Sequence, residues 1–176
     1  RSVGFDMYLK MLDETVQELK GEEVPLEVHS SLNLGLDIRI PADYITDEHQ
    51  RLRAYKRIAD AKDAEQAETV RAELADRYGP PPEAVGTLIS FALLKTEAER
   101  LGVEAIDRRG GAAQIKFHPG SKIDPARLME LISSVDGAQF TPAGVLRLPL
   151  GASSDAPAAV LDFLAQSLAA LKAKVA

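Results

Sequence analysis

The sequence predicts an α+β fold, a single mixed domain of helices packed on a small sheet, preceded by a separate amphipathic helix and a linker. Segments with the apolar period of a helix occur in groups, and segments with the period of two typical of strands come in pairs around glycine turns. Strands and helices do not alternate regularly, which disfavours a doubly wound α/β sheet.

The first predicted element is an amphipathic helix. Apolar residues recur at helical spacing over residues 5–19, before a lysine and a glycine that end the helix. Residues 21–33 are polar and irregular, which is typical of a linker. The predicted organisation is therefore a helix at 1–20, a linker at 21–33 and the main domain at 34–176. Because the chain starts inside an expected helix, we expect a piece of a longer protein.

The main domain begins with a predicted strand over residues 34–40, where leucine and isoleucine alternate with glycine and charged residues before Pro41. Thr46 is expected to cap the next helix and Asp63 the one after it, and these two helices should form a hairpin. A third helix is expected over residues 82–100, and its wide apolar surface predicts a mostly buried position. The predicted buried residues of the hairpin are Leu52, Tyr55, Ile58, Ala59, Ala67, Val70, Leu74 and Tyr78.

The second half of the chain predicts two pairs of strands and two helices. The first pair surrounds Arg109-Gly110-Gly111, a hairpin signal. The expected strands cover residues 103–106, 113–117, 138–141 and 145–148, and the expected helices cover residues 124–134 and 155–174.

Composition and charge exclude several classes of function. Apolar residues make up 45% and charged residues 27%, as in ordinary folded domains. A net charge of -6 disfavours a surface that holds duplex DNA through phosphate contacts and suits a protein partner with a basic patch. The absence of cysteine excludes disulfides and thiolate zinc sites. No apolar stretch approaches the length of a membrane span, so we expect a soluble, cytoplasmic protein without a membrane partner.

The sequence predicts no catalytic, cofactor-binding or metal-binding residue. Gly110-Gly111 is followed by Ala-Ala-Gln, so it does not form a nucleotide-binding loop. His29, His49 and His118 lack the spacing that would place two of them on one metal, and we expect all three at the surface. We therefore predict that the chain is not an enzyme. A small enzyme with a site built from scattered carboxylates remains an alternative.

Two charged features are candidates for binding. Glu48, Arg51, Arg53, Lys56 and Arg57 form a mostly basic run on one predicted helix. A solvated helix face is the preferred interpretation of this run, and a nucleic-acid-binding accessory domain is the alternative.

The second feature is the carboxylate pair Glu73 and Asp76, which fall about 60° apart on the outer flank of their predicted helix. They share this flank with the small residues Thr69 and Ala72. Two carboxylates beside small side chains can approach a flat partner and accept bidentate hydrogen bonds from arginines. From these residues alone, an exposed acidic flank with Glu73 paired to Arg77 is the favoured interpretation.

Three strings of residues carry a family resemblance. They are Val3-Gly4-Phe5-Asp6-Met7-Tyr8, then Ile40-Pro41-Ala42-Asp43-Tyr44-Ile45 followed by Arg51-Leu52 and Tyr55-Lys56-Arg57-Ile58, then Glu73-Leu74-Ala75-Asp76-Arg77-Tyr78-Gly79. In this order and spacing they resemble the C-terminal (TRCF, or D7) domain of the bacterial transcription-repair coupling factors, the Mfd family. The likeness continues to Leu101-Gly102 and is looser after Gly110.

The resemblance implies a part in transcription-coupled nucleotide excision repair. The family combines an ATP-dependent DNA translocase with contacts to RNA polymerase and to the repair protein UvrA. The C-terminal domain would dock on the UvrB-like module of the same chain and mask its UvrA-binding surface, with Glu73 and Asp76 in that contact opposite arginines. Residues 1–20 would pack on the upstream motor. Detached from that motor, their apolar face predicts a dimer of the fragment that has no physiological counterpart.

Overall fold

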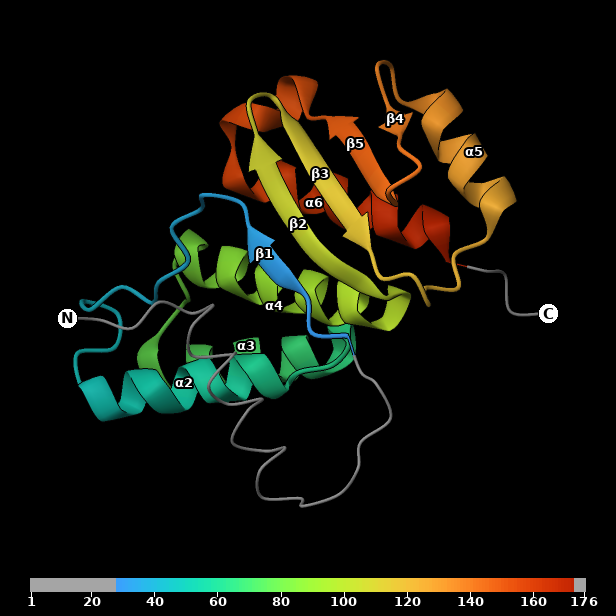
Figure 1. Ribbon diagram of the computed structural model, residues 1–176. Helices are drawn as coiled ribbons and strands as arrows, with labels where there is room; N and C mark the ends of the chain where they lie inside the picture. Colours follow the sequence, from blue (N-terminus) through green and yellow to red (C-terminus); the bar gives the residue numbers. More distant parts are fainter. Residues whose placement is uncertain (1–27, 173–176) are drawn as a thin grey trace. The chain divides into compact units, whose positions relative to one another are not determined.

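A computed structural model describes residues 28–172, which form five α-helices, one short 3₁₀ helix and a five-stranded mixed sheet (Figure 1). The predicted α+β class is confirmed. These residues divide into two compact units, one formed by residues 37–93 and the other by residues 28–36 together with 94–172. The expected helix at 1–20 lies outside the described residues.

The first unit contains α2 (Glu48–Asp60), α3 (Ala64–Tyr78) and most of α4 (Glu83–Leu101). Helices α2 and α3 form the expected hairpin and lie side by side in Figure 1. The cap of α2 is Asp47, which accepts a hydrogen bond from the His49 amide at 3.3 Å, so the prediction of Thr46 was wrong by one residue.

Leu52 of α2 was expected in the core, but 42% of it is exposed. The buried residues of this helix are Ala54, Tyr55, Ile58 and Ala59. At 100° per residue, Leu52 lies about 90° from the centre of that stripe, at the edge of the buried face.

Helix α3 begins and ends at the residues that the sequence indicates. Its cap Asp63 accepts a hydrogen bond from the Gln66 amide at 2.8 Å. Gly79 ends the helix with a φ of 88°, a conformation that side chains disfavour. Val70 and Leu74 are buried as predicted, whereas Tyr78 is only half-buried.

The first strand lies earlier in the chain than expected. Strand β1 covers Ser31–Asn33, inside the segment predicted as linker, and residues 34–40 form no strand. Gly35, with a φ of 68°, turns the chain out of the extended path directly after β1. The alternation over residues 34–40 still reports burial, because Leu34, Ile38 and Ile40 are buried without belonging to the sheet.

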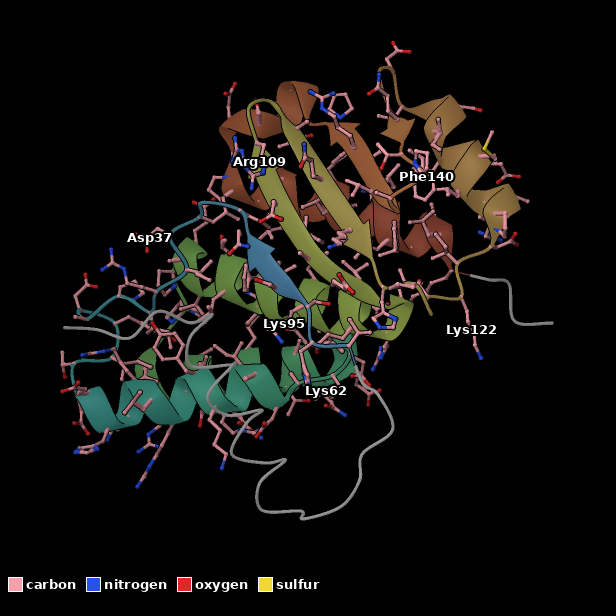
Figure 2. The ribbon with its side chains drawn as sticks, in the orientation of Figure 1. Asp37, Lys62, Lys95, Arg109, Lys122 and Phe140 are labelled. Carbon is pink, nitrogen blue, oxygen red and sulfur yellow. The ribbon has the colours of Figure 1, made fainter. Side chains whose placement is uncertain are left out.

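The second unit is built on one sheet with the strand order β1-β2-β3-β5-β4. Its other strands are β2 (Val103–Arg109), β3 (Ala112–Phe117), β4 (Gln139–Phe140) and β5 (Val145–Pro149). Strand β1 pairs parallel to β2, and the remaining neighbours are antiparallel. Figure 2 shows Arg109 near the tip of the β2–β3 hairpin and Phe140 at the opposite edge of the sheet.

Three short elements complete the second unit: α5 (Pro125–Ser134), the 3₁₀ helix η1 (Gly151–Asp155) and α6 (Pro157–Leu171). Asp124 caps α5 through the Ala126 amide at 2.9 Å. The predicted last helix began too early, because residues 151–155 form the separate 3₁₀ turn before Pro157 starts α6. Helix α6 lies behind the strands in Figure 1 and buries an almost continuous leucine face.

A polar network holds β1 in this unit. The buried Ser30 donates from its hydroxyl to the Val103 carbonyl oxygen at 2.5 Å and from its amide to Glu99 at 3.2 Å. Glu99 also accepts a hydrogen bond from Lys95 at 2.8 Å. The two bonds of Ser30 attach the residue before β1 to β2 and α4. The Ser30 hydroxyl and the Lys95 ammonium both have partners, as buried donors require.

Candidate docking site

The candidate site is the outer flank of α3. Glu73 and Asp76 are both exposed, as are Thr69 and Ala72 beside them. Residues three apart on a helix are neighbours on its surface, so the two carboxylates project from one patch. The opposite side of the helix is held by the buried Val70 and Leu74.

Glu73 is already engaged by an arginine of its own unit. Arg57 on α2 donates from Nη2 to Oε1 at 2.7 Å and to Oε2 at 2.6 Å, and from Nε to Oε2 at 3.1 Å. Both side chains are 52% exposed. The hydrogen bonds and the charge of Glu73 raise the pKa of Arg57 above its ordinary value, so this guanidinium stays charged. The pair cross-links the two helices of the hairpin.

The local pairing favoured by the residues alone does not form. Arg77, four residues after Glu73, instead lies over the Tyr78 ring, with its guanidinium carbon 5.5 Å from the ring centroid. This is a cation–π distance. Glu73 is therefore tied to another helix and Arg77 to an aromatic ring.

Asp76 differs from Glu73 in its surroundings. Within residues 28–172 it makes no hydrogen bond or ion pair. An exposed carboxylate has four lone-pair positions that can accept bonds from a guanidinium. The two candidate residues are thus unequal, since one is engaged within the unit and the other has its full acceptor capacity available.

Two tyrosines anchor the C-terminal end of α3 beneath this flank. The Tyr44 hydroxyl lies 2.8 Å from the Gly79 carbonyl oxygen and 3.1 Å from that of Leu74. The Tyr44 and Tyr78 rings meet edge to face at 5.9 Å, and the Tyr78 hydroxyl donates to Gln50 at 2.8 Å. Burial, and then the charge of Tyr78, raise the pKa of Tyr44. The backbone that carries Glu73 and Asp76 is therefore fixed before any partner binds.

Two of the four cations in the basic run on α2 are used inside the first unit. Arg51 donates to the carbonyl oxygens of Ile45 at 2.7 Å and Thr46 at 3.0 Å, and Arg57 holds Glu73. Arg53 and Lys56 remain exposed, with no ion pair to another described residue. Two such cations are few for a surface that binds nucleic acid through phosphates.

The histidines occupy separate places. His49 is exposed, His29 lies 3.8 Å from Glu99, and the half-buried His118 accepts a hydrogen bond from the Gly120 amide at 2.9 Å. Between residues 28 and 172 no group of three or more histidine and acidic side chains is placed to hold a metal ion. In the same range, no helix combines the length and apolar character needed to cross a membrane.

Sequence reasoning missed the residues that position the site. Tyr44, Arg51, Tyr55 and Arg57 belong to the quoted family strings, and all four make intramolecular hydrogen bonds. The Tyr55 hydroxyl, for example, accepts a hydrogen bond from the Ile40 amide at 2.8 Å. Their occurrence in those strings was a signal, but a contact between residues 16 positions apart on two helices leaves no periodic pattern.

Comparison with known proteins assigns the chain to one family. The model of the TRCF domain family matches residues 34–128. A transcription-repair-coupling factor from Myxococcus xanthus is 32% identical over 154 residues, which cover 86% of this chain and 13% of that protein. The transcription-repair-coupling factor of Escherichia coli (strain K12) is 34% identical over 136 residues, covering 74% of this chain and 12% of that protein. The chain thus corresponds to a small part of each relative.

A solved structure shares the fold. The crystal structure of the C-terminal domain of a transcription-repair coupling factor superposes with a TM-score of 0.71 at 21% identity, covering 84% of this chain and 96% of that one.

Proposed function

Because this chain belongs to the TRCF domain family, the C-terminal domain of transcription-repair coupling factors, we propose that it is a non-catalytic docking domain that holds its parent protein in a repressed state. In this proposal the parent is an ATP-dependent DNA translocase that acts on stalled RNA polymerase and recruits UvrA. The domain docks on the UvrB-like module of the same chain and masks the surface that binds UvrA.

The exposed carboxylate pair on α3 carries the proposal. Glu73 and Asp76 lie three residues apart on a helix whose end is anchored by Tyr44 and Gly79. A fixed pair of carboxylates recognises arginines well, because a guanidinium forms two parallel hydrogen bonds with a carboxylate. The UvrB-like module would supply those arginines.

A polar contact suits a clamp that has to open. Interfaces between domains of one chain are commonly small and polar, and partners shift them by binding one state better than the other. An arginine–carboxylate contact gives specificity and can be replaced by competing polar contacts when RNA polymerase or DNA engages the motor. Residues 1–20 would link the domain to that motor.

The experiment compares two double variants of the intact parent protein. Glu73→Ala with Asp76→Ala should expose the UvrA-binding surface, so UvrA binding and basal ATPase activity should rise. The control is Glu65→Ala with Glu68→Ala, which removes the same charge at the same spacing from another exposed part of α3. In the isolated chain, either pair of substitutions should change the free energy of unfolding by no more than about 1 kcal/mol, as is usual for exposed polar positions.

The outcomes separate docking from folding. Unchanged UvrA binding in the Glu73 and Asp76 variant would reject the proposal. A large loss of stability would instead assign these residues to the fold. A rise of UvrA binding in both double variants would attribute the effect to net charge and not to this patch.

A further inference from the structure

A row of polar side chains crosses all five strands of the sheet in the second unit. The strand registers pair Asn33 with Asp107, Asp107 with Gln114, Gln114 with Arg147, and Arg147 with Gln139. Residues paired in this way lie beside each other on the same face of a sheet. The row therefore presents an amide, a carboxylate, a second amide, a guanidinium and a third amide in sequence.

The row lies on the face opposite the core. On each of β1, β2, β3 and β5, one chain neighbour of the row's residue is buried. These neighbours pair with one another across the sheet and are Leu32, Ile106, Ile115 and Leu146. Successive side chains of a strand point to opposite faces, so the polar row faces away from this apolar row. In Figure 1, α6 lies behind the strands, and no helix of the second unit crosses in front of them.

The middle of the row has unused hydrogen-bonding groups. Asn33 donates to Asp107 at 2.8 Å, which occupies one end of the row. Gln114, Arg147 and Gln139 make no side-chain hydrogen bond or ion pair with the rest of the described chain, although Gln114 and Arg147 are half-buried. A half-buried guanidinium without a counter-ion, between two amides, is a site that accepts a carboxylate.

We propose that this row is a docking surface for a helix of a protein partner that carries one basic and one acidic side chain two turns apart. Asp107 and Arg147 are separated by two strand spacings, or about 10 Å. A helix rises about 10.5 Å over seven residues, so positions i and i+7 of a crossing helix meet the two charges. In an extended segment, side chains on one face are spaced by about 6.6 or 13 Å, so an extended partner fits this separation less well.

The surroundings of the row favour a protein helix over a nucleic acid. The neighbouring row contains the small Ala105 and Val145, which leave room for a helix to approach. Its one cation, Lys116, lies 3.6 Å from Glu104. The row on the other side carries a second cation, the exposed Arg109, two residues from Asp107 on the same strand. A phosphate backbone would meet the carboxylate of Asp107 within two strands of Arg147, and like charges at that distance disfavour it. This surface does not involve α3, so the inference is independent of the function proposed above.

The test uses isotope-labelled chain and alanine-based helical peptides of about 20 residues, long enough to be helical in water. One peptide carries Glu and Lys at i and i+7, a second carries the same pair at i and i+4, and a third carries two lysines at i and i+7. Nuclear magnetic resonance titration should show shifts at β2, β3 and β5 with the first peptide. Affinity for the second should be at least about fivefold lower.

Charge reversal supplies the decisive comparison. Arg147→Glu should reverse the preference, so that the two-lysine peptide binds better than the Glu/Lys peptide. Arg53→Glu, the same change at an exposed arginine of the other unit, should leave the order of affinities unchanged. If Arg147→Glu does not fold, Arg147→Gln should lose the preference for the Glu/Lys peptide. No binding of that peptide, equal binding at both spacings, or an Arg147-dependent interaction with a single-stranded oligonucleotide instead would overturn the proposal.

Discussion

Arg57 on α2 donates hydrogen bonds to both carboxylate oxygens of Glu73 on α3, at 2.6 and 2.7 Å. One of the two carboxylates proposed to dock is therefore satisfied before docking. An arginine of a partner would have to share Glu73 with Arg57 or displace it, and the two guanidinium groups repel each other. Arg57 thus competes with an arginine of the partner for Glu73 and disfavours the docked state.

The first prediction concerns this competitor. Arg57→Ala should strengthen docking of the domain on the UvrB-like module, because Glu73 becomes available and a repelling cation is removed. In the intact parent protein the proposed clamp would then close more tightly, so UvrA binding should fall. The free energy of unfolding of the isolated chain should fall by no more than about 1 kcal/mol, since the Arg57–Glu73 pair is half-exposed and such pairs contribute little to stability.

Arg53→Ala is the matched control, because it removes an exposed arginine of the same helix that has no described ion pair. Increased UvrA binding with Arg57→Ala alone would show the opposite role, in which Arg57 orients Glu73 for the partner. Denaturant unfolding of the isolated variants checks the stability part of this prediction.

A second prediction separates the core of the first unit from its surface. Leu74 is 6% exposed and Leu52 is 42% exposed, and both are leucines of the helical hairpin. Leu74→Ala should cost about 2 to 5 kcal/mol through a core cavity, whereas Leu52→Ala should cost less than about 1 kcal/mol. Urea unfolding of the two variants measures the difference. Equal losses would contradict the buried stripe described for α3.

The helices were largely predictable because their ends carry local chemistry. Asp63, Asp124 and Gly79 cap or end helices through contacts within a few residues, and the apolar period identifies the buried faces. The paired strands around Gly110-Gly111 were also visible as a hairpin.

The features that the sequence did not predict correctly depend on contacts between residues far apart in the chain. The alternation over residues 34–40 resembles a strand, yet Ile40 gives its amide hydrogen to the Tyr55 hydroxyl and no strand forms. Strand β1 exists because Ser31–Asn33 pairs with β2, more than 70 positions later. Apolar residues alternate without a break from Leu32 to Ile40, so the pattern alone could not show which part of this segment joins the sheet. The exposure of Glu73 followed from its helical position, but its bond to Arg57 did not.

A third prediction tests the anchor of α3. Tyr44→Phe keeps the ring contact with Tyr78 and removes the hydroxyl that lies 2.8 Å from the Gly79 carbonyl oxygen. The free energy of unfolding should fall by about 1 to 2 kcal/mol, because a partly buried carbonyl group is left without its hydrogen-bond donor. Chemical denaturation of the isolated chain measures it. An unchanged midpoint would show that water replaces the hydroxyl without cost.

The fourth prediction follows from the raised pKa of Tyr44, which comes first from burial. The folded chain holds this proton more tightly than the unfolded chain, whose tyrosine has its ordinary pKa of 10.0. The corresponding stability is complete below pH 10 and is lost as pH rises through the raised pKa. The free energies of unfolding of the unchanged chain and of Tyr44→Phe should therefore converge above pH 10. A constant difference from pH 8 to 11 would contradict this titration.

The last prediction concerns the inequality of the two carboxylates that we propose for docking. Glu73 already has Arg57 as a partner, whereas Asp76 has none among the described residues, so a partner arginine gains more from Asp76. Asp76→Ala should therefore release more UvrA binding in the intact protein than Glu73→Ala. In the Arg57→Ala background this difference should shrink, because Glu73 then offers the same free acceptor oxygens. The measurement is UvrA affinity for the single variants and for each combined with Arg57→Ala, a double-mutant cycle that isolates the coupling between Arg57 and Glu73. A larger effect of Glu73→Ala in both backgrounds would mean that the partner binds the Arg57–Glu73 pair as a unit and does not compete for it.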